Sequence, residues 1–455
     1  MSKPLTLQLA EFVVHTRRSA ISAMAMERAR MSLASTVASA AMGYGIESAS
    51  IIRKLELNNG GSGLATVWFN GTKLPLAAAV RVNAVASDAA ASDDSDLRSI
   101  AHIGTIASAT AVALGEQTGA SGAETLAAMV LGYEVAGRID EALTPGRMQR
   151  GFHGSVSTVF AAAAAAGLLL KLPVLQMAHA IALAATSIGG MAVSADTSCA
   201  REYHAGLSAA TGVQAALAAQ LGFLAELTVL ERPRGFLAAM GGQDLDDITR
   251  DFGSSWDIVT DMAIKLMPGA HPFHATAEAA ADAARLGKVA VEDIESVAIS
   301  AAVQWTNFKG DSHPRNLVDA AHSLVYFVAA AIADGGFGWQ HMNEEKMADP
   351  VIARLQDKVV FDPSPPPLPD RFPHRHGGSV TIRIKNGQEF RSTCAAPRGS
   401  GPRGVEWADV ERKYRDLMPL SGIAQERIDA SLAFIRNLDD GSTIEHLTKL
   451  LAPKA

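Results

Sequence analysis

The spacing of hydrophobic positions predicts helices over most of the first 265 residues. Apolar residues recur at helical intervals in residues 5–14, 23–42, 99–117, 120–143, 155–170 and 206–221. Alanine dominates the apolar positions of these segments, and small side chains let helix backbones approach one another closely. The pattern therefore predicts a compact helical domain.

The pattern changes after about residue 270. Residues 296–305 (SVAISAAVQW) have the alternation and the β-branched content of a strand. Residues 380–384 and 389–393 flank Asn386-Gly387, a dipeptide that supplies the two positive-φ positions of a type I′ turn, so a β-hairpin is expected there. Residues 361–373 are rich in proline and indicate a connection. Helical periodicity returns over residues 405–450.

The predicted fold is mainly α with an α+β second domain. A large all-helical domain is expected from both chain ends, residues 1–268 with 401–455. A smaller α+β domain, residues 269–400, is inserted between them.

Composition and charge narrow the class of protein. Hydrophobic residues make up 48% of the chain and charged residues 19%, which excludes disorder as its general state. A net charge of −7 gives no electrostatic reason to expect nucleic acid as a partner. The 2 cysteines, Cys199 and Cys394, are too few for a disulfide scaffold or a cysteine metal site.

One segment, residues 172–195, carries no charge and is long enough to cross a bilayer. About half of it is alanine, glycine, serine and threonine, which contribute little transfer free energy, so we expect a buried helix instead. Residues 1–18 lack the basic start, apolar centre and cleavage site of a signal peptide. The expectation is a cytoplasmic protein without a membrane partner.

Common sequence motifs for cofactors, metals and nucleophiles are absent. No Rossmann or Walker glycine fingerprint occurs, and residues 58–63 (NNGGSG) indicate a surface turn. His271 and His274 lie three apart without a cysteine or carboxylate partner in register, and His374 with His376 suggests a solvated pair. No metal site is predicted, and GxSxG is missing.

Polar groups at the edges of apolar helices are the remaining candidates for chemistry. Asp93, Asp94, Ser95 and Asp96 precede a helix that contains His102. These acids suit a helix N-terminus, where the dipole favours negative charge. Alternatively, one aspartate and His102 face a cleft as proton-transfer groups.

Three further positions combine cations with histidines. His153 at a helix entrance can cap the helix or bind a carboxylate with the backbone N–H groups there. Arg201 and His204 precede an alanine-rich helix. Lys265, flanked by isoleucine, leucine and methionine, either extends its amine to water or is partly desolvated as an acid, base or anion ligand.

Taken together, these stretches resemble the MmgE/PrpD family, which includes 2-methylcitrate dehydratase, cis-aconitate decarboxylase and iminodisuccinate epimerase. The similarity covers nearly the whole chain, and the matching segments occur in the family's order. They are residues 9–13 (LAEFV), 83–94 (NAVASDAAASDD), 150–166 (RGFHGSVSTVFAAAAAA), 201–206 (REYHAG), 265–279 (KLMPGAHPFHATAEA) and 322–326 (HSLVY).

The resemblance implies a fold and a chemistry. It implies a helical domain from both termini, an α+β lid, a homodimer, no dissociable cofactor or metal, and a site between the domains for small di- or tricarboxylates. The implied reaction removes a proton from carbon next to a carboxylate, followed by loss of water, loss of CO₂ or reprotonation. Cations and donors aimed at carboxylates must stabilise the carbanion character that develops.

Matching positions carry the family's site onto this chain. The implied catalytic residues are His102, Lys265, Asp93 and Tyr326. The implied substrate-binding residues are His153, Arg201, His204, Ser95 and His274.

This chain also departs from the family's motifs. The histidine before the acidic loop is Asp88, and the first aspartate and aromatic of DFDD are Ala91 and Ser92. The lysine of K-x-[LM]-H-x-G is Arg201, which binds carboxylates but does not deliver a proton near neutral pH. In the KPYPxC segment, Met267 and Ala270 replace tyrosine and cysteine.

The favoured hypothesis is a cofactor-independent lyase, most closely a 2-methylcitrate dehydratase-like elimination. An epimerase or decarboxylase on a related polycarboxylate is the alternative. A third hypothesis is a carboxylate-binding protein without turnover, because one fold hosts several functions.

Overall fold

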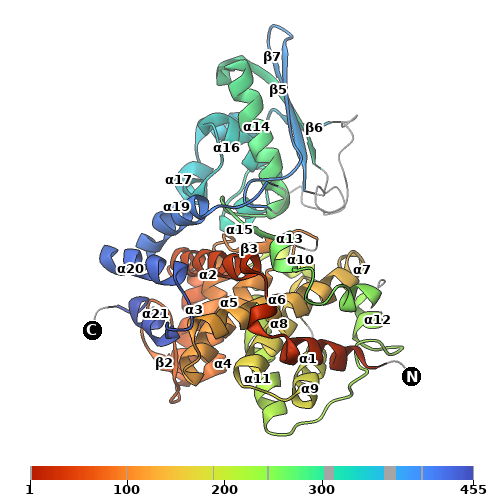
Figure 1. Ribbon diagram of the computed structural model, residues 1–455. Coiled ribbons are helices and arrows are strands. Elements are labelled where there is room, and N and C mark those ends of the chain that lie inside the picture. The colour runs from red at the N-terminus through yellow and green to blue at the C-terminus, as the bar shows by residue number, and fades with distance from the viewer. Residues whose placement is uncertain are drawn as a thin grey trace. The chain divides into compact units, whose positions relative to one another are not determined.

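A computed structural model describes residues 3–98, 100–187, 189–242, 245–301, 312–362, 376–400 and 403–453. The chain divides into two compact units, Met1–Ile264 with Trp407–Ala455, and Lys265–Glu406 (Figure 1). The first unit is helical, and the second combines helices with a four-stranded sheet. The predicted mainly α fold with an α+β part is therefore confirmed.

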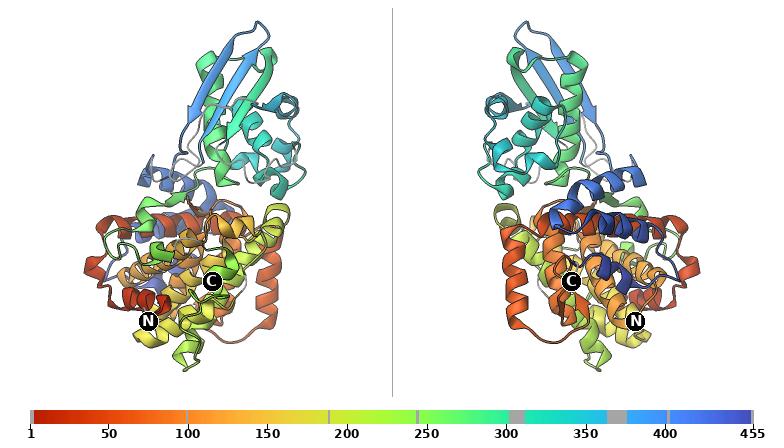
Figure 2. Two further views of the ribbon diagram at one scale, coloured as in Figure 1. Left: turned by 90° about the vertical axis from the view of Figure 1, so that its right-hand side faces the viewer. Right: turned by 90° about the vertical axis from the view of Figure 1, so that its left-hand side faces the viewer.

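The helices of the first unit come from both ends of the chain. They are α1 (Leu5–His15), α2 (Ala23–Gly43), α3 (Glu47–Asn59), α4 (Leu76–Ala89), α5 (Ile103–Thr118), α6 (Gly122–Leu143), α7 (Gly146–Gln149), α8 (Ser155–Leu169), α9 (Val174–Ala184), α10 (Ala192–Thr197), α11 (Ala200–Gln220), α12 (Phe236–Met240), α13 (Asp257–Thr260), α19 (Trp407–Leu417), α20 (Gln425–Arg436) and α21 (Ile444–Leu450). Helix α19 packs against α2, and the two views of Figure 2 show these terminal helices side by side. Packing of α19 on α2 joins the C-terminal segment to the N-terminal domain.

Helix α8 is the centre of this unit and contacts α5, α6, α9 and α11. Its alanine run, residues 161–166, is fully buried, so this part of the helix exposes no face to solvent. Two glycines allow the close approach: a Cβ on Gly132 of α6 would lie 2.7 Å from the Ala161 carbonyl oxygen, and one on Gly212 of α11 would lie 2.5 Å from the Ala162 Cβ. Small residues on both partners therefore set the spacing of these helices.

Three helix boundaries differ from the predicted ones. Helix α5 begins at Ile103, so His102 precedes this helix, whereas the prediction placed His102 within it. The apolar run at residues 172–195 is not one helix, because α9 ends at Ala184 and α10 begins at Ala192 after a turn with Gly189 and Gly190. Helix α11 begins at Ala200, so Arg201 and His204 lie within its first turns rather than before it. In the part of the chain that the structure describes, no helix is long and apolar enough to cross a membrane.

The second unit is built on a mixed sheet with the strand order β6-β5-β7-β8. Its strands are β5 (Ile294–Ala301), β6 (Val359–Phe361), β7 (Gly378–Ile384) and β8 (Glu389–Cys394). Its helices are α14 (His274–Gly287), α15 (Leu317–Ala321), α16 (Leu324–Asp334), α17 (Glu344–Met347) and α18 (Pro350–Gln356). Helix α14 packs on β7 and β8, and α16 packs on α14 (Figure 1).

The β7–β8 hairpin was predicted correctly, but its turn was not. Gly387 has a φ of 85°, whereas Asn386 is not among the residues with positive φ. The N–H of Gly387 donates to the Ile384 carbonyl, and the Asn386 Oδ1 accepts from the Gln388 N–H. These bonds indicate a three-residue loop with a glycine bulge instead of type I′. Residues 302–305 of the predicted strand and 363–373 of the predicted connection lie outside the described residues.

Two short ladders complete the first unit. Strand β1 (Ala65–Thr66) pairs with β2 (Lys73–Leu74), close to the predicted turn, where Gly60 and Gly61 have positive φ. Strand β3 (Asp94–Asp96) pairs antiparallel with β4 (Met262–Ile264), so the acidic loop is tied to the last three residues before Lys265. Neither of these ladders is evident in the hydrophobic pattern.

Candidate active site

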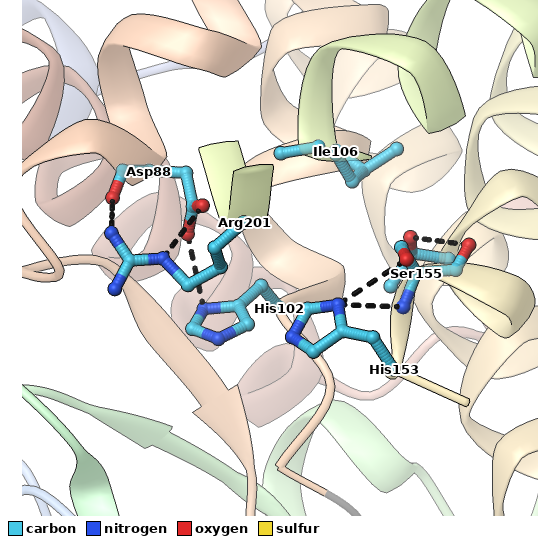
Figure 3. Close-up of a pocket in the computed structure, with 8 residues that line it drawn as sticks. Asp88, His102, Ile106, His153, Ser155 and Arg201 are labelled. Atoms are coloured by element: carbon cyan, nitrogen blue, oxygen red, sulfur yellow. Dashed lines mark hydrogen bonds and ion pairs between the residues drawn. The ribbon is translucent and has the colours of Figure 1, made fainter. Parts of the chain in front are cut away.

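A small pocket in the first unit brings together three of the six site residues that the sequence suggests for this unit, His102, His153 and Arg201. The end of α4, the residues just before α5 and in its first turn, the entrance to α8 and the first turns of α11 supply its walls. It is lined by Asp88, His102, Ile106, His153, Ser155, Thr158, Arg201 and Ala205 (Figure 3). The imidazoles of His102 and His153 lie next to each other there, with Asp88 and Arg201 on one side and Ser155 on the other.

The acidic loop has both of the roles that the sequence left open. Asp94 caps α5, because its Oδ1 accepts the N–H of Thr105 at 3.1 Å. Asp93 Oδ2 accepts from the Thr105 hydroxyl at 2.9 Å and lies 2.7 Å from His102 Nδ1. Burial, and then the charge of Asp93, raise the pKa of Asp94 to about 6. One aspartate therefore completes the helix end while its neighbour orients an imidazole.

His102 is held between two carboxylates. Its Nδ1 lies 2.7 Å from Asp93 Oδ2 and 3.5 Å from Asp88 Oδ1, and the residue is 8% exposed. An N–H on Nδ1 donates to Asp93, which leaves Nε2 to exchange a proton with a ligand. This arrangement is the orienting pair that general acid–base chemistry requires.

His153 stands beside His102, with ring centroids 6.1 Å apart and an interplanar angle of 25°. Its Nδ1 contacts the Ser155 Oγ at 3.2 Å, and its backbone N–H donates to the Gly190 carbonyl. Burial, with a smaller contribution from the charge of His102, places the pKa of His153 well below its usual value. This imidazole is therefore neutral near pH 7 and able to accept a proton or a hydrogen bond.

Arg201 and Asp88, two of the residues that depart from the family motifs, form an ion pair. Nε of Arg201 donates to Asp88 Oδ2 at 3.0 Å, and Nη2 donates to the Asp88 backbone carbonyl at 2.6 Å. Burial alone would lower the pKa of Arg201, but the charges of Asp88 and Glu202 outweigh it and raise the pKa. The two substitutions thus form one charge-balanced unit.

His204 lies next to His153, with ring centroids 5.8 Å apart. Burial lowers the pKa of His204, and the charge of Asp88 acts in the opposite direction. Within the described residues, its Nδ1 has no hydrogen-bond partner. Gly190 contacts this ring so closely that a Cβ there would lie 1.8 Å from Cε1 of His204.

Ser95 is not part of this pocket wall. It lies in β3 opposite Ala263 and is fully buried. Its hydroxyl makes no hydrogen bond in the described part of the chain. A substrate-binding role for Ser95 stays a prediction.

The second unit holds the other predicted residues. Lys265 is 2% exposed and begins this unit. Burial, and then the positive charge of Lys265, place the pKa of His274 well below its usual value. The ring of His271 lies 4.7 Å from that of His274 and 5.9 Å from that of His376. His376 is 1% exposed, so the prediction of a solvated His374–His376 pair was wrong for His376, whereas His374 lies outside the described residues.

Tyr326 occupies the interior of the second unit. Its hydroxyl donates to the His341 carbonyl at 2.7 Å, and its ring packs edge-on against Phe337. Burial raises the pKa of the phenol above its usual value. These contacts are structural, and they explain why Tyr326 is buried. Proton donation by Tyr326 stays a prediction.

One cluster in the described residues has the composition of a metal site. Asp88, Asp93 and His102 each offer one ligand atom, and these atoms lie within 4.8 Å of one another. Arg201 already binds Asp88 Oδ2 at 3.0 Å, so a divalent cation would have to coexist with a guanidinium on the same carboxylate. The donor set therefore fits a hydrogen-bonded acid–base group better than a metal centre.

Sequence reasoning did not identify Asp88, Ser155, Thr158 or Gly190 as site residues. Asp88 was noted only where it differs from the family motif. Asp88 could have been identified because positions 88 and 201 both differ from the family motifs, and residues that change together are often in contact. Gly190 carries no local signal, since its proximity to His204 depends on the packing of α11.

Comparison with known proteins gives a consistent result over most of the chain. The model of the MmgE/PrpD N-terminal domain matches residues 7–248, and the model of the MmgE/PrpD C-terminal domain matches residues 267–439. Cis-aconitate decarboxylase of Homo sapiens is 27% identical over 402 residues, which cover 85% of this chain and 82% of that protein.

Two more relatives are similar over shorter stretches. The Mus musculus cis-aconitate decarboxylase is 26% identical over 73% of this chain and 68% of its own length. A cis-aconitate decarboxylase-like protein of Aspergillus oryzae is 24% identical over 73% of this chain and 72% of its own length.

Proposed function

Because the chain belongs to the MmgE/PrpD family, we propose that it is a lyase acting on a small di- or tricarboxylate. The reaction begins at a carbon next to a carboxylate, where a proton is removed or added. It needs no dissociable cofactor, since cationic and hydrogen-bonding side chains stabilise the charge that develops on the carboxylate.

The observation that carries this proposal is the pairing of His102 with Asp93 beside His153. The 2.7 Å contact fixes one nitrogen of His102 and leaves the other for proton transfer. A neutral imidazole, His153, is the next group along the same wall. Two adjacent imidazoles with different partners can serve as acid and base in one turnover.

In the elimination, one imidazole takes the proton from the carbon next to the carboxylate. The electrons of that C–H bond form the new C=C bond while the C–O bond to the leaving hydroxyl breaks. The second imidazole donates a proton to the hydroxyl, which leaves as water. Arg201 and His204 are the proposed carboxylate ligands of the first unit. For Lys265 and His274 of the second unit, the family resemblance supports the role of carboxylate ligands. The 2-methylcitrate dehydratase-like reaction follows this course.

Decarboxylation is the second candidate, and the named relatives favour it. There the C–C bond to a carboxylate breaks, CO₂ leaves, and the electron pair is protonated at carbon by the same acid. An epimerase would return the proton to the opposite face without a leaving group. Binding without turnover remains the non-enzymatic alternative.

Proton NMR of chelator-treated protein in D₂O separates these reactions. The substrates are 2-methylcitrate, citrate, cis-aconitate, hydroxysuccinate and iminodisuccinate. New vinyl signals from a saturated substrate establish elimination, and loss of CO₂ from cis-aconitate establishes decarboxylation. Deuterium in an unchanged skeleton indicates epimerisation. Absence of any change with all five compounds would contradict the proposed activity, and carboxylate-induced thermal stabilisation without turnover would then support the binding protein.

Lys265→Ala tests the contribution of the second unit. We expect turnover to be lost while the melting temperature stays within a few degrees. Lys358→Met is the matched control, because the Lys358 amine donates to the Ile294 backbone carbonyl in the same unit. A Lys265→Ala variant that keeps full activity would remove Lys265 from the site.

A further inference from the structure

We propose that Lys413, a residue of the C-terminal helix α19, is a positioning residue that holds Asp93 against His102. The inference rests on the proposed function and deepens it, because it adds to the site a residue that lies outside the pocket wall. Lys413 follows Ser92 of the acidic loop by 321 positions in the sequence. Its link to that loop is therefore created by the tertiary structure.

The ammonium of Lys413 is buried where α19 packs on α2 (Figure 1). The residue is 2% exposed. Its Nζ donates to the Ser35 hydroxyl of α2 at 2.7 Å and to the backbone carbonyl of Ser92. Burial of a charge is unfavourable unless acceptors compensate it, and hydrogen bonds from a charged donor are stronger than neutral ones. The amine and its two acceptors are therefore held firmly together.

The Ser92 carbonyl belongs to the peptide group that leads into Asp93. Because a peptide group is planar, a donor that fixes its oxygen also fixes the backbone nitrogen of Asp93. Asp93 is fully buried, and its Oδ2 lies 2.7 Å from His102 Nδ1. Lys413 therefore acts one peptide unit away from the carboxylate that orients the imidazole.

The backbone around Ser92 needs a contact of this kind. The preceding residue, Ala91, has a φ of 50°, a left-handed conformation that residues with a Cβ rarely adopt. The Ala91 N–H donates to the Asp88 carbonyl at 2.9 Å, which closes a turn after α4. Ser92 and Asp93 link this turn to strand β3. Lys413 ties that link to a third element of the same unit.

Lys413 also places a positive charge near the acidic loop. Burial raises the pKa of Asp94, and the charges of His102 and Lys413 act in the opposite direction. The same amine thus fixes the backbone of the loop and offsets part of its negative charge.

Lys413→Met is the diagnostic variant, because it removes the amine and retains most of the side-chain volume. We expect kcat to fall about tenfold to a hundredfold while KM changes less than about threefold, since a small displacement of Asp93 misorients His102. Tyr414→Phe is the matched control. Tyr414 is the next residue of α19 and is also buried, but its hydroxyl bonds to Ser431 at 2.7 Å. Its kcat should stay close to that of the wild type.

A double-mutant cycle separates positioning from a general structural role. If Lys413 acts through Asp93, Lys413→Met should cost little in an Asp93→Asn background, because the carboxylate that it positions is already absent. Equal fold losses of kcat in the two backgrounds would show that Lys413 does not act through Asp93, which would overturn the inference.

A spectroscopic measurement tests the inference without turnover. The Nδ1 proton of His102, bound to Asp93, is expected to give a downfield proton NMR resonance, identified by its loss in His102→Gln. This resonance should move or disappear in Lys413→Met and persist in Tyr414→Phe. Its absence from the wild-type spectrum would contradict the His102–Asp93 hydrogen bond and overturn the inference.

The resonance also separates failure of this inference from failure of the proposed function. An unchanged resonance in Lys413→Met would overturn the positioning role and leave the proposed function intact. A changed resonance in a protein that turns over none of the candidate substrates would support the positioning of Asp93 and contradict the proposed function alone.

Because Lys413 is buried, the melting temperature of each variant is recorded first. Ser35→Ala is the second variant, since it removes one acceptor of the amine and keeps the Ser92 carbonyl. It is expected to move the His102 resonance in the same direction as Lys413→Met, by a smaller amount. If Lys413→Met does not fold, an unchanged resonance in Ser35→Ala would overturn the inference.

Discussion

At the scale of single residues, the chemistry depends on how one imidazole is held. His102 is fixed by Asp93 at 2.7 Å and approached by Asp88 at 3.5 Å. The sequence suggested His102 and Asp93 together, because the acidic loop directly precedes the helix that was predicted to contain His102. It could not show that Asp88 completes the arrangement, since Asp88 ends a different helix.

His102→Gln is expected to lower kcat about a hundredfold to ten-thousandfold, because glutamine keeps polarity but cannot transfer a proton at neutral pH. The matched control is His179→Gln. His179 is also 8% exposed, but its Nδ1 accepts from the Ala225 backbone N–H in a structural contact. The two variants are compared by steady-state kinetics at equal folded fraction. Equal losses of kcat would contradict a catalytic role for His102.

Asp94 provides a pH test at the same scale. Its pKa is raised to about 6 in the folded state, chiefly by burial, from about 3.9 when unfolded. Between these values the native state holds a proton that the unfolded chain loses, so stability falls as pH rises through this window and stays reduced above it. Asp94→Asn removes that cost and keeps the Oδ1 acceptor for Thr105.

We therefore expect Asp94→Asn to raise the free energy of unfolding by on the order of 1–3 kcal/mol near pH 8. The gain should largely disappear near pH 4, where the wild-type carboxyl is protonated in both states. Denaturant unfolding at the two pH values measures the difference. A gain of the same size at both would show that ionisation of Asp94 is not its cause.

At the scale of elements, the long helices follow from the sequence and the interruptions do not. Helices α2, α6 and α8 begin and end within a few residues of their predicted bounds. The apolar run after residue 172 is an exception, because it is divided by the Gly189–Gly190 turn. Its composition suits a buried helix and a buried turn equally well. Contacts with α8 and α11 decide between them: a Cβ on Gly189 would lie 2.5 Å from the Val156 N atom, and Gly190 contacts His204.

Gly190→Ala tests this turn. The added methyl would occupy the space of the His204 ring, whose Cε1 lies 1.8 Å from where the alanine Cβ would stand, so the imidazole must move. We expect kcat/KM to fall about a hundredfold, as a displacement of about 1 Å in a site can do. Gly45→Ala is the control, because a Cβ there meets nothing within 4 Å. Unchanged kinetics in Gly190→Ala would show that His204 need not hold this position.

At the scale of the whole molecule, both family models match, one in each half of the chain. The family resemblance implies a homodimer, and several large apolar side chains are exposed in the first unit. They include Ile51 and Leu55 on α3, Tyr203 and Leu207 on α11, and Leu221, Phe223 and Leu224 after α11. Exposed apolar surface of this kind is typical of a protein interface.

We therefore expect a mass of about 95 kDa, twice 47.6 kDa, in size-exclusion chromatography with light scattering. Ile51→Glu with Leu55→Glu on α3, and Leu207→Glu on α11, should shift this mass toward the monomer if these helices form the interface. Leu286→Glu in the second unit is a control of similar exposure. A monomer of the wild-type chain over the micromolar range would contradict the dimer.

The sequence by itself determined the helical class, the inserted α+β part, the β7–β8 hairpin and the family. Those features depend on local periodicity, on turn residues and on the order of motifs, and all three can be seen in the amino-acid sequence. Tertiary structure alone decided that Asp88 pairs with Arg201, that Gly190 touches His204 and that His376 is buried beside His271. These contacts join residues from separate elements, and their distances are set by how helices and strands pack, which no single segment encodes.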